Sequence, residues 1–144
     1  MPLTPYESLA WAGWALAAAL LLSVPLIWRW GRSAERECGL ALMLATSADL
    51  GIQLVAMPAA AAHSVGNLLA LLLITRNALS SVRFYPLVMA AAQLIAVITH
   101  ALFWLGLSNG GTSYPILIFA LDAATLMALW AGCAMTRFKP DRLR

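Results

Sequence analysis

Four polar residues stand inside long apolar stretches of this chain. They are Asp49, Asn67, His100 and Asp122, and most of their sequence neighbours are Ala, Leu, Ile or Val. An ionisable side chain in hydrocarbon costs several kcal/mol, and it is tolerated where it faces protein or water. Carboxylates and imidazoles in such positions bind protons, cations or ligands. We therefore take these four residues as the candidate ion or ligand site.

The four residues also share a depth. Each lies about seven or eight residues from the outer end of the helix that we expect around it, which is roughly 10–12 Å at the rise of an α-helix. Four helices would thus present one polar group each in a common layer. The sequence predicts an intramembrane polar layer on this basis.

His100 and Asp122 are expected to touch across the last helical hairpin. They lie at similar distances from the Gly110–Gly111 turn, so antiparallel helices would place them opposite each other. Such a pair can serve as a structural lock between two helices, which is the interpretation that we favour from the sequence. It can also be part of a proton, cation or ligand site, and this alternative stays open.

No pattern of catalytic or metal-binding residues is found in the sequence. It has no HExxH motif, no nucleophile elbow and no phosphate-binding loop, so we expect a protein that is not an enzyme and holds no metal. His63 and His100 could ligate a haem iron from two helices. Their expected depths differ by about two helical turns, so we expect no cofactor and interpret His63 as an interfacial histidine. Cys38 and Cys133, without a CxxC motif, are interpreted as small buried hydrophobes.

Composition identifies the elements that must position the polar layer. Hydrophobic residues make up 62% of the 144 positions, charged residues make up 10%, and the mean hydropathy is +0.83. A chain of this length cannot hide that much apolar surface inside a water-exposed domain, so lipid is the expected solvent. The predicted fold class is an all-α, polytopic integral membrane protein without a soluble domain.

Five transmembrane helices are predicted. They cover about residues 8–28, 38–57, 60–79, 86–107 and 115–136, each long enough for a hydrocarbon core of about 30 Å. The stretch 38–79 could hold one span or two. Two spans place Arg76 and Arg83 on the same side as Arg29, as the positive-inside rule requires, whereas one span separates them. The predicted N-terminus is therefore outside and the C-terminus inside.

Three classes of function fit this architecture. We favour an accessory or assembly subunit of a larger or homo-oligomeric membrane complex, because the expected body has no domain for chemistry outside the membrane. The alternatives are a small oligomeric transporter or channel that uses the polar layer, and a holin-type pore former. The expected partners are membrane lipids and either further copies or a host complex, without nucleic acid. Arg strongly exceeds Lys and Ala and Leu are abundant, so we expect a bacterial cytoplasmic (inner) membrane.

Overall fold

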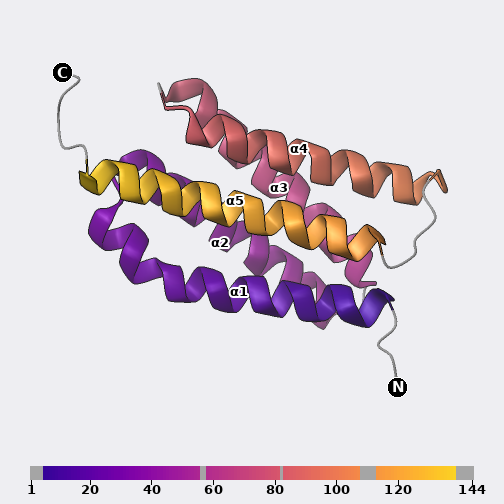
Figure 1. The fold of residues 1–144 in the computed structure, drawn as a ribbon. Coiled ribbons are helices and arrows are strands. Elements are labelled where there is room, and N and C mark those ends of the chain that lie inside the picture. The colour runs from indigo at the N-terminus through magenta and orange to yellow at the C-terminus, as the bar shows by residue number, and fades with distance from the viewer. Residues whose placement is uncertain (1–4, 56–57, 82, 108–112, 139–144) are drawn as a thin grey trace.

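The protein is a bundle of five α-helices (Figure 1). The structure, a computed structural model, describes residues 5–55, 58–81, 83–107 and 113–138. The helices are α1 (Pro5–Trp30), α2 (Ser33–Leu54), α3 (Ala59–Ser80), α4 (Tyr85–Trp104) and α5 (Ser113–Phe138). The predicted all-α class and the division of residues 38–79 into two helices are confirmed. The Gly-rich turn expected before α5 falls largely outside the described residues.

The helices form a closed ring in chain order. Each helix packs against the next one along the chain, and α5 returns to pack against α1. Figure 1 shows α1, α5 and α4 on one side of the bundle with α2 and α3 behind them. Successive helices run in opposite directions, so the α1–α2 and α3–α4 connections and the end of α5 lie at one end.

Local chemistry explains two of the helix boundaries that differ from the prediction. Helix α2 begins at Ser33 rather than near residue 38, since the Glu35 carboxylate accepts a hydrogen bond of 2.9 Å from the Arg32 backbone N–H. Helix α4 ends at Trp104 rather than near residue 107. Gly106 adopts φ 70°, and the Leu107 N–H donates to the Leu102 carbonyl at 2.9 Å, which closes the helix with a left-handed glycine.

Three helices are long and apolar enough to cross a membrane. They are α1 over Gly13–Trp30, α4 over its whole length, and α5 over its whole length. This supports a membrane location for the chain. Among the described residues, α2 and α3 do not reach the same apolarity, because they carry charged and amide side chains at several positions: Glu35, Arg36, Glu37, Asp49, His63, Asn67, Arg76 and Asn77.

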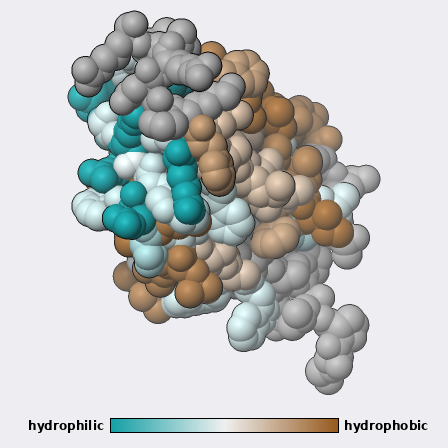
Figure 2. Space-filling model, turned by 60° about the vertical axis from the view of Figure 1, so that its left-hand side comes forward, coloured by the Kyte–Doolittle hydropathy of each residue, from teal (hydrophilic) through white to brown (hydrophobic). Residues whose placement is uncertain are grey.

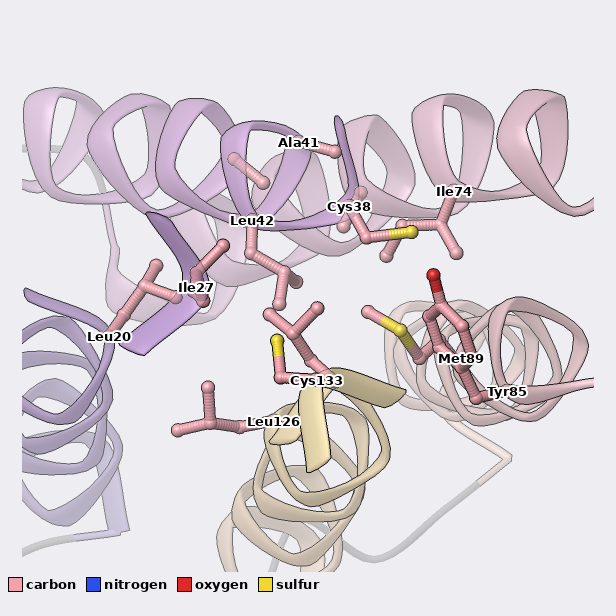
Figure 3. Packing of buried hydrophobic residues seen from close by; sticks show 13 residues of the cluster. Leu20, Ile27, Cys38, Ala41, Leu42, Ile74, Tyr85, Met89, Leu126 and Cys133 are labelled. Atoms are coloured by element: carbon pink, nitrogen blue, oxygen red, sulfur yellow. The ribbon is translucent and has the colours of Figure 1, made fainter. Parts of the chain in front are cut away.

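The buried apolar residues form two clusters at different levels of the bundle. The larger cluster, shown in Figure 3, lies toward the end with the arginines and includes Leu42, Ile74, Met89 and Leu129. The smaller one lies toward the other end, around Ile118 of α5. Figure 2 shows hydrophilic surface on part of the end that is turned forward and hydrophobic surface over much of the rest of that view. The side chains that could do chemistry lie between the two clusters.

Candidate functional site

A layer of buried polar side chains separates the two apolar clusters. On α3, α4 and α5 polar residues lie between residues of the two clusters, so that α4, for example, runs from Met89 through Gln93 to Ala96. His100 lies one turn beyond Ala96, beside the smaller cluster. All of these polar residues are buried: Asp49, His63, Asn67, Gln93, His100, Asp122 and Thr125. Four helices therefore contribute to one interior layer.

Asp49 and His63 form an ion pair between α2 and α3. The His63 Nδ1 lies 2.8 Å from the Asp49 Oδ2, and the Gln53 side chain donates to the Asp49 Oδ1 at 2.9 Å. His63, interpreted from the sequence as an interfacial histidine, lies one turn into α3, and its side chain is only 5% exposed, so it faces the interior of the bundle. Helix α1 covers it at Gly13, where an added Cβ would lie 2.9 Å from the His63 Cε1.

His100 is held by partners on α3 and α5. Its Nε2 lies 3.1 Å from the Asn67 Nδ2, and its Nδ1 lies 2.5 Å from the Tyr114 hydroxyl. Because an amide nitrogen only donates, the His100 Nε2 accepts, and the neutral ring then carries its proton on Nδ1. Tyr114 accepts that proton in a hydrogen bond. Both ring nitrogens of His100 are thus used.

The expected His100–Asp122 contact is therefore wrong. Asp122 instead accepts a hydrogen bond of 3.3 Å from the Gln93 side chain, which also donates to the Thr125 hydroxyl at 3.1 Å. The bounds of the two helices explain the difference. Helix α4 ends at Trp104 rather than near residue 107, and α5 begins at Ser113 rather than near residue 115. The point opposite Asp122 therefore lies more than one turn further back along α4, in the turn that holds Gln93.

The polar layer encloses a small cavity. Its volume is about 20 Å³, and its polar wall consists of Thr46, Asp49, His63, Asn67, Gln93 and Asp122. A space of this size accommodates about one water molecule. Three of the four residues predicted from the sequence thus meet at one place, and His100 stands behind Asn67.

The charges around this cavity are unequal. Two carboxylates face it, and His63 is the one residue of its lining that can carry a positive charge. If both carboxylates ionise, one negative charge remains without a compensating group in the cavity wall, which is costly in a poorly hydrated interior. In addition, the Gln93 Oε1 is a buried acceptor without a partner among the described residues. A proton on Asp122 would remove the excess negative charge, and a water bound beside it could donate to the Gln93 Oε1.

Residues suited to a metal or haem are not gathered in the part of the chain that the structure describes. No three His, Cys, Asp or Glu side chains lie together there in an arrangement for a metal ion. His63 is engaged by Asp49 and His100 by two other side chains, so haem ligation would require both histidines to leave their partners. Cys38 and Cys133 are buried and unbridged.

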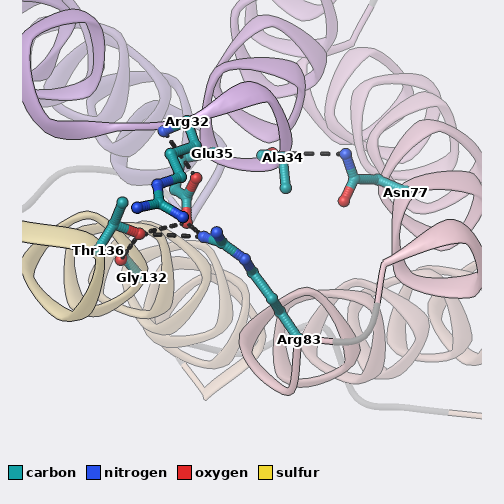
Figure 4. A network of polar contacts seen from close by, with 7 residues as sticks. All are labelled: Arg32, Ala34, Glu35, Asn77, Arg83, Gly132 and Thr136. Atoms are coloured by element: carbon teal, nitrogen blue, oxygen red, sulfur yellow. Dashed lines mark hydrogen bonds and ion pairs between the residues drawn. The ribbon is translucent and has the colours of Figure 1, made fainter. Parts of the chain in front are cut away.

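A second polar cluster, which the sequence analysis missed, lies at the arginine-rich end (Figure 4). Its centre is Glu35, whose side chain is 0% exposed. Glu35 forms an ion pair with Arg83 and accepts a hydrogen bond of 2.8 Å from the Thr136 hydroxyl. The position of Glu35, three residues after Arg32 at the start of a helix, is the signal that could have found it.

Two residues of the interior layer, His63 and Gln93, were not among the site residues predicted from the sequence. Gln93 and His63 line the cavity, but only the spacing of His63 and Asn67, four residues apart on α3, pointed to a shared face.

Comparisons of the chain with protein-family models, with curated proteins and with solved structures find no match.

Proposed function

We propose that all five helices cross the membrane, with the arginine-rich end on the cytoplasmic side. Helices α2 and α3 have 22 residues each, enough for a bilayer core, and both take full part in the ring. Their polar residues Asp49, His63 and Asn67 are buried in the bundle, so the outward faces that would meet lipid do not include them. Among the described residues, every arginine from Arg29 to Arg137 lies toward one end of this arrangement.

We propose further that the protein is a small membrane transporter or channel that binds a proton in its interior layer. The observation that carries this proposal is the cavity of about 20 Å³ that Asp49, His63 and Asp122 share. Intramembrane carboxylates and histidines in one chain of contacts are typical of proton relays. The cavity wall has one more acidic group than basic groups, which favours the binding of a proton at Asp122.

A proton fits this cavity better than a metal cation does. Hard cations such as Ca²⁺ take six to eight oxygen ligands. Here the two oxygens of Asp49 already accept from Gln53 and pair with His63. A single water beside Asp122 and the unpartnered Gln93 Oε1 needs only the space that is present.

Reconstituted liposomes provide the test. Protein in vesicles that contain a pH-sensitive dye should admit protons when a potassium diffusion potential is imposed, and Asp122→Asn should abolish this flux. The Thr99→Val variant is the matched control, since the Thr99 hydroxyl donates only along its own helix, to the Ile95 carbonyl at 2.8 Å. Flux that is equal in Asp122→Asn and in the wild type would refute the proposal.

An accessory or assembly subunit is the second candidate. The observation that favours it is the exposed position of Ala120 and Ala124 on α5, because small residues let a neighbouring helix approach closely. Elution from a mild detergent together with foreign subunits, in amounts that Ala124→Phe reduces, would support this function. A holin-type pore finds no comparable support in the contacts of the bundle.

A further inference from the structure

A pocket of about 280 Å³ opens at the arginine-rich end, away from the interior layer. It lies where the α1–α2 connection meets the start of α4 and the end of α5. Arg32 and Arg83 form its charged part, and Phe84 and Met135 belong to its apolar part. The close-up in Figure 4 shows the two arginines converging beside Thr136. The pocket is thus charged on one side and apolar on the other.

Contacts with Glu35 and Thr136 fix Arg83 on the charged side of the pocket. Arg83 forms an ion pair with the fully buried Glu35 and donates to the Thr136 hydroxyl at 3.0 Å, yet its side chain stays 34% exposed. The lining of the pocket contains two guanidinium groups and no carboxylate, because Glu35 lies buried behind Arg83. A guanidinium fixed in this way matches the geometry of a phosphate group.

The apolar side of the pocket continues onto the outer surface of the bundle. Phe84 is 77% exposed and Met135 is 65% exposed, and the following turn of α4 adds the exposed Leu87. Helices α4 and α5, which border the pocket, are two of the three that are apolar enough to span a membrane. A ligand here would therefore meet a phosphate-binding end and a hydrocarbon-binding face at the same time.

The depth of the pocket agrees with the headgroup level of a bilayer. Trp30 lies at the same end, and the Arg137 guanidinium stacks 4.2 Å from the centre of its ring. Tryptophan and arginine gather at this level in membrane proteins. Basic pockets between transmembrane helices on the cytoplasmic side bind anionic lipid headgroups.

We propose that this pocket binds an anionic phospholipid, with the phosphate against Arg32 and Arg83 and one acyl chain along the α4–α5 surface. The group that the arginines would recognise is a phosphate, which a lipid headgroup or a free phosphate could supply. The apolar surface beside the arginines assigns it to the lipid. The inference does not depend on the proton site, since the two share no lining residue.

Native mass spectrometry of the detergent-purified protein tests the proposal. Phosphatidylglycerol should remain bound, whereas phosphatidylcholine should be lost at the same activation energy. Arg32→Gln should weaken phosphatidylglycerol binding about fivefold, the effect of one positive charge near a membrane surface. Arg76→Gln, an equal loss of charge at the same end but outside the pocket, should leave binding unchanged.

A second variant covers the case in which loss of Arg32 disturbs the fold. Met135→Glu adds a carboxylate at the mouth of the pocket without touching the Glu35–Arg83 pair, and it should also weaken phosphatidylglycerol binding. Equal weakening by Arg76→Gln and Arg32→Gln would overturn the pocket assignment. Competition by inorganic phosphate as strong as that by the lipid would overturn the assignment to a lipid.

Discussion

The contribution of the interior layer to the free energy of unfolding can be measured at the Asp49–His63 pair. Asp49→Leu removes the partner of the His63 Nδ1 at 2.8 Å and the acceptor of the Gln53 amide at 2.9 Å, both in buried surroundings. Breaking a buried ion pair from one side costs about 3–5 kcal/mol. Hydrogen bonds between membrane helices are weaker, with a mean of about 0.6 kcal/mol. We expect Asp49→Leu to lower the unfolding free energy by about 3 kcal/mol, because a charge is involved.

A double-mutant cycle separates the pair from its surroundings. His63→Leu in the Asp49→Leu background should cost little more, since the stranded imidazole is then gone, and the coupling energy should be about 2 kcal/mol. The assay is reversible unfolding in mixed micelles, followed by circular dichroism. Asp49→Asn keeps the shape of the side chain but not its charge, so it measures how much of the lost unfolding free energy is due to the charge. Additive losses within about 0.5 kcal/mol would show that the pair is not energetically coupled and would refute the reasoning.

Three further predictions concern packing, the arginine-rich end and topology. Gly66→Ala should destabilise the bundle by about 1–3 kcal/mol in the same assay, because its Cβ would lie 3.0 Å from a side-chain carbon of α2, whereas Gly51→Ala meets nothing within 4 Å and should be neutral or slightly stabilising. Glu35→Gln should cost about 2 kcal/mol, since it removes the charge that Arg83 meets, and an unchanged unfolding midpoint would contradict this. Single cysteines at Ser33 and Ser81, in a Cys-free background, should both resist an impermeant label applied from outside; labelling of only one would contradict five spans.

The sequence could predict the helices and the depth of the polar groups because both follow from composition along the chain. Apolar runs, arginines at their ends and the period of the helix place Asp49, Asn67 and Asp122 at one level. The rotation and the register of one helix against another depend on side-chain packing and on single turns. Helix α4 ends early, just before Gly106, and α5 begins early at Ser113, and together these shifts bring the turn of Gln93, in place of His100, beside Asp122.

The burial of Glu35 and of His63 could not be predicted from the sequence, for a different reason. Each looked like a residue at a membrane surface, because charged and imidazole groups near helix ends usually face water. Their burial depends on neighbours that are distant in the sequence: Arg83 and Thr136 for Glu35, and Gly13 for His63. The capping position of Glu35 marks the start of a helix, but it does not encode these contacts with distant residues.

The closure of the ring by α5 has a consequence for biosynthesis. If all five helices cross the membrane, as we propose, they enter it from the N-terminus. A nascent chain with α1 to α4 inserted then lacks the wall that α5 supplies, and Gln93 has yet to meet Asp122 and Thr125. In that interval the polar side chains of the earlier helices face lipid, translocation machinery or one another. Arrival of the last helix seals the layer, so chains truncated before α5 should be substrates for membrane proteases even though four of their five helices are intact.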